Sequence, residues 1–256
     1  MALPALVLVH GGGLAADSWE LTVDEIHRQE PELAVVTLDM PGRRNKPGDL
    51  RRLTIADFVA SLVGDIESAE LHDVVIVGHS MGAMTLPGVV TKLGAARVRE
   101  VIFAAAFLPP EGTSIVDSAP WLLARIARRF AKKGVPRETP RWLARLGYLN
   151  GVPSRRRRFM AGKLYPESLR ILTETVSRRG MPGDVPRTWI LTRRDRALAP
   201  KLQRKYIEAL GGVQTLIEID TCHCLMVSEP ERLAGILVER CRLYAGSTDQ
   251  QPEVRA

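Results

Sequence analysis

The sequence contains few cysteines and no apolar run long enough to cross a membrane. Its three cysteines, Cys222, Cys224 and Cys241, are odd in number and lie toward one end, so they imply no disulfide framework. No apolar stretch approaches the ~20 residues that a bilayer requires. The first residues show neither the basic segment nor the cleavage site of a secretory signal. Together these absences predict a cytoplasmic protein.

The composition is otherwise that of a globular protein, but its charge is unevenly distributed. The chain has 256 residues, of which 45% are hydrophobic and 25% charged, and a net charge of +7. Residues 108–186 contain 16 Lys/Arg and six Asp/Glu, whereas the rest of the chain is slightly acidic. One segment therefore carries the basic character of the whole protein.

Six short apolar runs predict buried parallel strands, and helical patterns follow all of them except the fourth. This alternation predicts an α/β fold with a mostly parallel, doubly wound sheet of about six strands and helices on both faces. In such sheets, ligands bind at the carboxyl ends of the strands. The six runs are Ala5–Val9, Ala34–Leu38, Val74–Val77, Val101–Ala106, Thr188–Thr192 and Gln214–Ile219.

The segment after the fourth run does not read as a simple crossover helix. It opens with Pro109-Pro110 and contains several short helical patterns separated by Gly and Pro. We therefore predict a core formed by residues 1–107 and 187–245. Residues 108–186 are predicted to form an inserted, basic, helical cap over the active site, and residues 246–256 a flexible tail.

The third apolar run ends in Gly78-His79-Ser80-Met81-Gly82 and then enters a helical pattern. A strand, a tight turn around a serine and a following helix are the context of a nucleophile elbow. The glycines are needed because the turn strains the backbone and brings it close to its neighbours. The sequence thus predicts Ser80 as a nucleophile.

A serine hydroxyl needs a base to take its proton, and that base needs an orienting carboxylate. Of the five histidines, only His223 follows the last predicted strand, where the base of this fold is expected. Asp195 lies just beyond the fifth strand and is the favoured acid. The alternatives are Asp220, three residues from His223, and Glu111 or Asp117 after the fourth strand.

The tetrahedral intermediate of acyl transfer requires two N–H donors. We expect one from the backbone of Met81, directly after the nucleophile. The other is expected from Gly12, with Gly13 as the alternative, in the His10–Gly13 loop after the first strand. This glycine loop lacks the full spacing of a nucleotide-binding motif, so no nucleotide cofactor is predicted.

These motifs, together with Asp195-Arg196-Ala197-Leu198 and the segment 222–230, resemble those of the α/β-hydrolase superfamily. The chain begins at the glycine-loop strand, as in the compact branch that contains plant methylesterases and hydroxynitrile lyases. The resemblance implies Ser80 as nucleophile, His223 as base and Asp195 as its orienting acid. The lyases usually have a lysine where this chain has Cys224, which argues against that activity. Ser80 argues against epoxide hydrolases and haloalkane dehalogenases, which use an aspartate at the elbow.

The cysteines beside His223 also raise the possibility of a metal site. Adjacent positions such as 222, 223 and 224 do not converge easily on one ion, and the sequence offers no second ligand cluster. We therefore predict no metal and no other cofactor, and expect Cys224 to pack near the active site.

In the cap, the segment Trp121–Phe130 places Leu122, Leu123, Ile126 and Phe130 on one stripe with arginines opposite. We expect this stripe to be buried against the mouth of the active site, with Trp121, Leu122, Ile126 and Cys224 bordering the substrate. The basic charge could instead attract an anionic lipid surface or an acidic acyl carrier. Nucleic acid is not expected, because Arg155–Arg158 has only Phe159 as an adjacent aromatic.

The sequence therefore predicts a serine hydrolase that cleaves a small-molecule carboxylic ester through an acyl-enzyme. A thioesterase acting on acyl-coenzyme A or acyl-carrier substrates and a hydrolase of carbon–carbon bonds remain alternatives. A ligand-binding protein on a hydrolase scaffold also remains open. The oligomeric state is not predicted.

Overall fold

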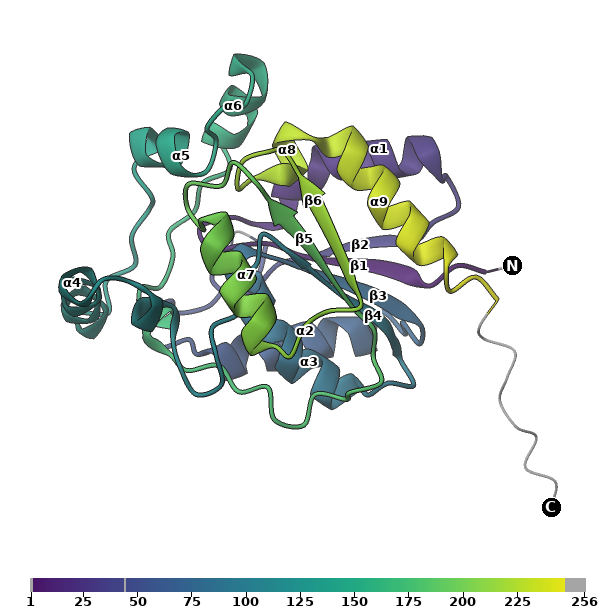
Figure 1. The fold of residues 1–256 in the computed structure, drawn as a ribbon, viewed down its shortest axis with the longest axis horizontal. Coiled ribbons are helices and arrows are strands. Elements are labelled where there is room, and N and C mark those ends of the chain that lie inside the picture. Colours follow the sequence, from purple (N-terminus) through teal and green to yellow (C-terminus); the bar gives the residue numbers. More distant parts are fainter. Residues whose placement is uncertain (1, 44, 247–256) are drawn as a thin grey trace.

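The computed structural model describes residues 2–43 and 45–246, without the side chain of Leu123. The predicted tail, residues 246–256, lies outside the described residues apart from Gly246. Six parallel strands form one sheet in the order β2-β1-β3-β4-β5-β6 (Figure 1), which confirms the predicted fold class. They are β1 Ala5–Val9, β2 Val35–Leu38, β3 Val74–His79, β4 Val98–Ala104, β5 Arg187–Thr192 and β6 Thr215–Ile219.

The fourth strand differs most from its predicted bounds, since it begins three residues earlier and ends two residues earlier. Its third residue is Glu100, and this charged residue hides the start of the strand from a search for apolar runs. The Glu100 carboxylate is fully buried, where it accepts hydrogen bonds from Arg240 and from Thr188. At the other end, Ala105 has a φ of 45° and so leaves the extended conformation.

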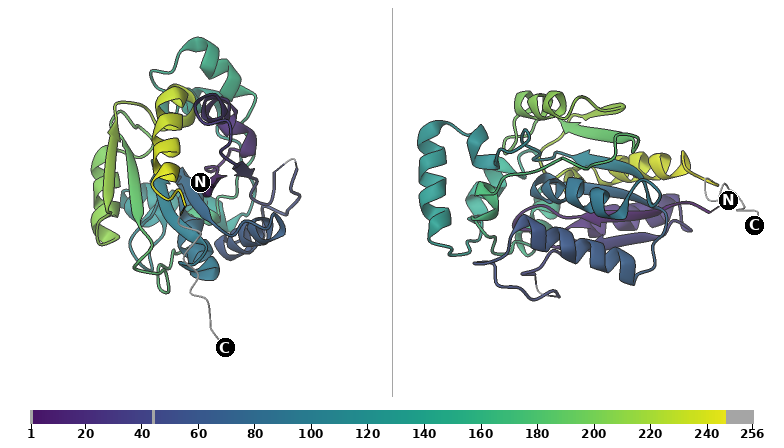
Figure 2. Two further views of the ribbon diagram at one scale, coloured as in Figure 1. Left: turned by 90° about the vertical axis from the view of Figure 1, so that its right-hand side faces the viewer. Right: turned by 90° about the horizontal axis from the view of Figure 1, so that it is seen from below.

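Helices cover both faces of the sheet (Figures 1 and 2). One apolar core lies between the sheet and α2, α3 and α7, and a second lies between the sheet and α1, α8 and α9. A capping box between Thr54 and Asp57 starts α2. These elements are η1 Ala16–Trp19, α1 Glu20–Gln29, α2 Ile55–Ser68, η2 Ser80–Thr85, α3 Leu86–Leu93, α7 Pro200–Ala209, α8 Leu225–Ser228 and α9 Pro230–Arg242.

The segment between β4 and β5 adds no strand to the sheet. Most of its helices lie beyond the carboxyl ends of the strands, at the left and top of Figure 1, and the chain then returns to the start of β5. Among the backbone hydrogen bonds that join this segment to the core, Tyr165 N–H donates to Gly13 O at 2.8 Å, and Cys224 N–H donates to Tyr148 O at 3.2 Å. Its helices are η3 Ile115–Ser118, α4 Trp121–Lys132, α5 Arg141–Gly147, α6 Ser154–Ala161 and η4 Ile171–Thr173. No helix within residues 2–43 and 45–246 is long and apolar enough to span a membrane.

Candidate active site

Ser80 stands on a strained turn between β3 and η2. Its φ is 52°, a value that L-residues adopt at a cost. The turn is so tight that it leaves no room for a side chain at either glycine. A Cβ on Gly82 would lie 2.2 Å from His10 O, and one on Gly78 would lie 2.8 Å from Ala83 Cα. Ser80 is the first residue of η2, which continues into α3. The first N–H groups of a helix have no acceptor within that helix, and this applies to those that directly follow Ser80.

The structure brings together the three residues that the sequence singles out. His223 Nε2 lies 2.8 Å from Ser80 Oγ, and His223 Nδ1 lies 2.7 Å from Asp195 Oδ2. An ionised carboxylate can only accept, so the Nδ1–H donates to Asp195 and Nε2 is left to accept from the serine hydroxyl. All three residues are buried. Ser80 therefore has a base in contact, and that base is held in the required tautomer.

Asp195 is fixed by the loop in which it lies. Its Oδ1 accepts from the N–H groups of Ala197 and Leu198 at 2.8 and 2.7 Å, and its Oδ2 accepts from Thr192 Oγ1 at 2.9 Å. The three alternative acids all lie elsewhere. Asp220 is half exposed beside Arg193 and Arg194, Glu111 binds Ser177 and Arg178, and Asp117 caps η3 and pairs with Arg128.

The two loops expected to supply the oxyanion donors meet beside Ser80. A Cβ on Gly12 would lie 3.5 Å from Met81 Cβ, and one on Gly11 would lie 2.9 Å from Ser80 Cβ, so the glycine loop lies against the elbow. The N–H of Gly13 donates to Glu167 Oε2 at 3.0 Å, whereas that of Gly12 has no acceptor within the described part of the chain. The geometry thus favours Gly12 over Gly13 as the partner of Met81.

Glu167 ties the cap to the glycine loop. Besides Gly13 N–H, its Oε2 accepts from Arg43, whose side chain is completely buried. The same Arg43 donates through Nε to Leu14 O at 2.5 Å. One buried ion pair between the core and the cap therefore holds the Gly13 N–H and the Leu14 carbonyl, directly after Gly12.

Two further histidines surround the site, and both are neutral. Burial, with a smaller effect from Arg43, lowers the pKa of His10 to about 3. Burial also holds the pKa of His79 well below its ordinary value, with an added contribution from His223. The His79 Nε2–H donates to the backbone carbonyl of His223 at 3.0 Å, and the two rings lie 5.0 Å apart. Through this hydrogen bond His79 holds the backbone of His223 and so positions the base.

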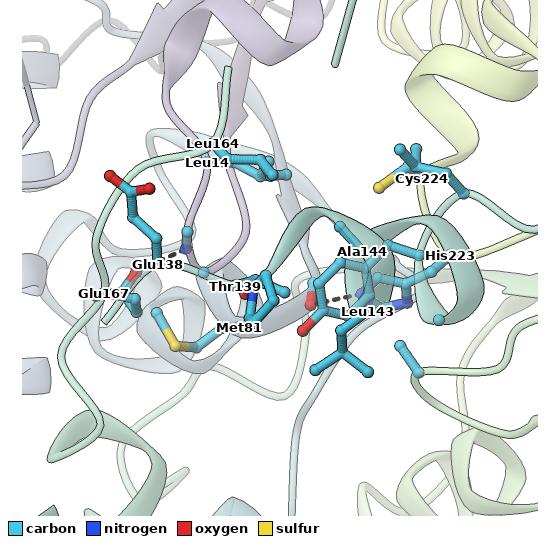
Figure 3. Close-up of a pocket in the computed structure, with 18 of the residues that line it drawn as sticks. Leu14, Met81, Glu138, Thr139, Leu143, Ala144, Leu164, Glu167, His223 and Cys224 are labelled. Carbon is cyan, nitrogen blue, oxygen red and sulfur yellow. Dashed lines mark hydrogen bonds between the residues drawn. The ribbon is translucent and has the colours of Figure 1, made fainter. Parts of the chain in front are cut away.

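A cavity of about 510 Å³ opens above Ser80 and His223. Figure 3 places His223 and Cys224 on one side of it and Glu138 and Glu167 on the other. Arg137 and Arg196 add positive charge to its lining. Most of its wall is apolar, with contributions from Leu14, Phe107, Ile115, Leu143, Leu164 and Leu172.

The cap helix α4 does not border this cavity as expected. Trp121, Leu122 and Ile126 are absent from its lining and are 74%, 49% and 44% exposed. Instead, α4 packs on its small residues, with Ala124 and Ala131 buried. The apolar stripe predicted that the large side chains of α4 face inward. In the structure the small alanines face the core, which allows the helix to approach it closely. Of the four residues predicted to border the substrate, the structure puts only Cys224 in the pocket wall.

No cluster of three or more His, Cys, Asp or Glu side chains within residues 2–43 and 45–246 could hold a metal ion. The three cysteines are free and buried. Burial raises the pKa of the Cys224 thiol well above its ordinary value, so this side chain is a neutral, apolar part of the pocket wall.

Several residues of the site escape sequence reasoning. Glu167, Arg43 and Tyr148 are remote from the motifs, and their roles depend on how the cap folds back onto the core. His79 could have been found, because it lies inside the elbow motif and its side chain must point beneath the serine. The structure adds it as a positioning residue.

The chain is similar to several known proteins in sequence and in fold. Salicylic acid-binding protein 2 of Nicotiana tabacum is 24% identical over 269 residues, which cover 93% of this chain and 97% of that protein. An extracellular alpha/beta-hydrolase from a Paenibacillus species, described as homologous in structure and function to that tobacco protein, has a similar solved structure. Its TM-score is 0.81 and its identity 22%, covering 93% of this chain and 99% of that one. The methylesterase MES16 from Arabidopsis has a TM-score of 0.75 at 17% identity, covering 94% and 100%.

These neighbours confirm the resemblance to the compact plant branch that the motifs indicate. The model of the alpha/beta hydrolase family matches residues 6–236, from the first strand into the last helix. The chain belongs to the alpha/beta hydrolase family.

Proposed function

We propose that the protein hydrolyses a small-molecule carboxylic ester through an acyl-enzyme, without a cofactor. Ser80 is the nucleophile, His223 the general base and acid, and Asp195 the residue that orients His223. The proposal rests on one observation, the unbroken series of hydrogen bonds from Asp195 through His223 to Ser80 Oγ at the floor of an apolar cavity. A methylesterase among the structural neighbours supports an ester as substrate.

In the first half-reaction, Ser80 Oγ attacks the ester carbonyl carbon while its proton moves to His223 Nε2. The carbonyl oxygen takes the negative charge and accepts from the N–H groups of Met81 and Gly12. The tetrahedral intermediate then expels the alkoxide, which takes the proton from His223 and leaves as an alcohol. Asp195 stabilises the imidazolium that forms between these two transfers.

In the second half-reaction, water takes the place of the alcohol. His223 removes one proton from it, the hydroxide adds to the acyl carbon, and the same N–H groups hold the oxyanion. When the bond to Ser80 Oγ breaks, His223 returns the proton to the serine and a carboxylic acid is released. Every proton transfer in this mechanism passes through His223, which is already hydrogen-bonded to Ser80 and Asp195.

Labelling with a fluorophosphonate probe tests this function directly. Wild-type protein should label covalently, whereas Ser80→Ala should not label at all and His223→Ala should label at least about 10³-fold more slowly. A wild type that does not label, or an alanine variant that labels equally, would show that the scaffold serves ligand binding instead. A panel of chromogenic esters of graded acyl length then measures how the cavity of about 510 Å³ selects its substrate.

A thioesterase is the second candidate, because Arg137 and Arg196 line the cavity. Their guanidinium groups offer partners for the phosphates of acyl-coenzyme A or of an acyl carrier. Turnover of an acyl-coenzyme A should then exceed that of a matched simple ester and fall as salt is raised. Equal turnover of the two substrates at all salt concentrations contradicts this second candidate.

A cytoplasmic location also remains a proposal. It is supported by the three buried cysteines, none of which forms a disulfide. The Paenibacillus structure is described as extracellular, so the compartment differs among similar folds. Immunodetection after separation of the cytoplasmic and secreted fractions of the source cells decides between the two.

A further inference from the structure

Helix α4 of the cap exposes an apolar stripe to solvent. Leu122, Ile126 and Phe130 are spaced four residues apart, lie along one side of the helix and are all exposed. Trp121 at the start of the helix is the most exposed of these side chains. Large apolar side chains gathered on one exposed helix mark an interaction site rather than random surface.

Basic side chains adjoin this stripe without acidic partners. Arg125, Arg129 and Lys132 are exposed on α4 and form no ion pair with any residue in the described ranges, whereas Arg128 pairs with Asp117. Across residues 119–166 the chain has thirteen Lys/Arg, and Glu138 is its one acid. A partner that carries negative charge would complement this surface.

The tryptophans point to the same region. Of the four in the chain, Trp19 and Trp189 are fully buried, while Trp121 on α4 and Trp142 on α5 are 74% and 65% exposed. Tryptophan favours the boundary between lipid and water, where its ring is buried and its N–H remains hydrated. Exposed Trp, an apolar stripe and flanking arginines together describe a helix that lies in a lipid interface.

Helix α5 carries further exposed apolar side chains at the mouth of the cavity. On α5, Leu143 lines the cavity and is also partly exposed, and its neighbours Trp142 and Leu146 are exposed. Both helices lie at the same end of the molecule, beyond the carboxyl ends of the strands (Figures 1 and 2). An apolar molecule leaving a lipid layer at this end would reach the cavity by a short path.

We propose that α4 and α5 dock on an anionic lipid surface, with the apolar stripe in the acyl boundary and the arginines against the headgroups. A second copy of the chain is a poor occupant, because it would bring two strongly basic surfaces together. An acidic protein or a free polyanion would satisfy the charges but leave the apolar stripe in water. Lipid satisfies both.

Vesicle sedimentation tests the docking with the Ser80→Ala protein, so that no lipid is hydrolysed during the measurement. The protein should bind vesicles of phosphatidylcholine mixed with phosphatidylglycerol, bind vesicles of phosphatidylcholine alone far more weakly, and dissociate as salt is raised. In a Trp142→Phe background, the emission of Trp121 should shift to shorter wavelength on binding. Failure to bind the anionic vesicles at low salt overturns the proposal.

Paired variants separate the charge from the apolar stripe. Arg125→Glu with Arg129→Glu should lower the vesicle partition coefficient roughly 25-fold or more, and Ile126→Asp roughly tenfold or more. The matched controls lie on the core: Lys201→Glu with Lys205→Glu on α7, and the exposed Leu243→Asp after α9. These should change binding less than about twofold, and thermal melting confirms that each variant is folded.

Each unfavourable result has a definite meaning. If Ile126→Asp binds as tightly as its parent, the surface recognises charge alone, and docking by the apolar stripe is wrong. If the α7 and α9 controls weaken binding as much as the cap variants do, the attraction is a property of the net charge. If wild type forms a dimer in solution that Ile126→Asp abolishes, a second copy is the occupant and the lipid proposal is overturned.

Discussion

Replacing Glu167 tests whether the ion pair between cap and core supports the glycine loop. In Glu167→Ala, Gly13 N–H loses its acceptor and the buried guanidinium of Arg43 loses its carboxylate. Removing one partner of a buried pair costs about 3–5 kcal/mol. For a protein of this size the melting temperature should fall by roughly 10 °C. Glu167→Gln keeps a neutral acceptor and should lose only about 1–2 kcal/mol.

The kinetic effect should appear in kcat rather than in KM, because Gly12 N–H acts on the oxyanion. In Glu167→Ala we expect kcat for a chromogenic ester to fall about tenfold or more, and KM to change less than about twofold. Glu167→Gln should recover most of the lost rate. Both quantities come from steady-state assays, beside urea unfolding of the same preparations.

A second cap carboxylate provides the control. Glu174 also accepts a hydrogen bond from a core backbone N–H, that of Ile55 at 2.8 Å, but does not line the cavity. Glu174→Ala should therefore lose stability while keeping its kcat. Adding Arg43→Leu to Glu167→Ala should restore part of the lost stability, since it removes the unpaired charge. If this second change restores none of the lost stability, or if both glutamate variants lose kcat equally, the ion pair does not support the glycine loop.

Three further predictions follow from the same structure. Because His10 and His79 stay neutral in the folded state, the unfolded chain alone takes up their protons below about pH 6.5. These two residues should therefore lower the free energy of unfolding by about 2 kcal/mol between pH 6 and 5 in urea titrations, and a flat profile contradicts this. Gly82→Ala should fail to fold, because its Cβ would meet His10 O, whereas Gly64→Ala, with open space in α2, should gain about 1 kcal/mol; equal melting temperatures would disprove the steric account. Asp195→Asn should lose about 10⁴-fold in kcat while remaining folded, and a loss under about tenfold would remove Asp195 from its role.

The sequence predicted the sheet well, because its four central strands are buried on both faces and read as nearly continuous apolar runs. The carboxyl ends of parallel strands meet at one edge of the sheet. The sequence therefore also predicted that Ser80, Asp195 and His223, which follow β3, β5 and β6, lie close together. Glu100 shows the limit of this reasoning. A buried charge paired with Arg240 is invisible to apolar patterning, so the start of β4 was missed.

The cap was harder to predict, because its packing is decided by contacts between distant segments. The apolar stripe of α4 predicted an inward-facing helix, yet Ala124 and Ala131 make the contact and Ile126 stays exposed. Nothing in the sequence near Glu167 indicates that it reaches Gly13, which is 154 residues away. Pairings of this kind depend on the folded cap and could not be derived from local patterns.

Three of the contacts that hold the cap to the core lie directly at the catalytic loops. Tyr148 accepts from Cys224 beside the base, while Tyr165 and Glu167 bind the glycine loop on its two sides. A designer could therefore exchange the stretches between these contacts, including all of α4, without touching the groups that perform the chemistry. Substrate preference and surface attachment could then change between relatives by replacement of one segment, while the reaction itself is inherited unchanged.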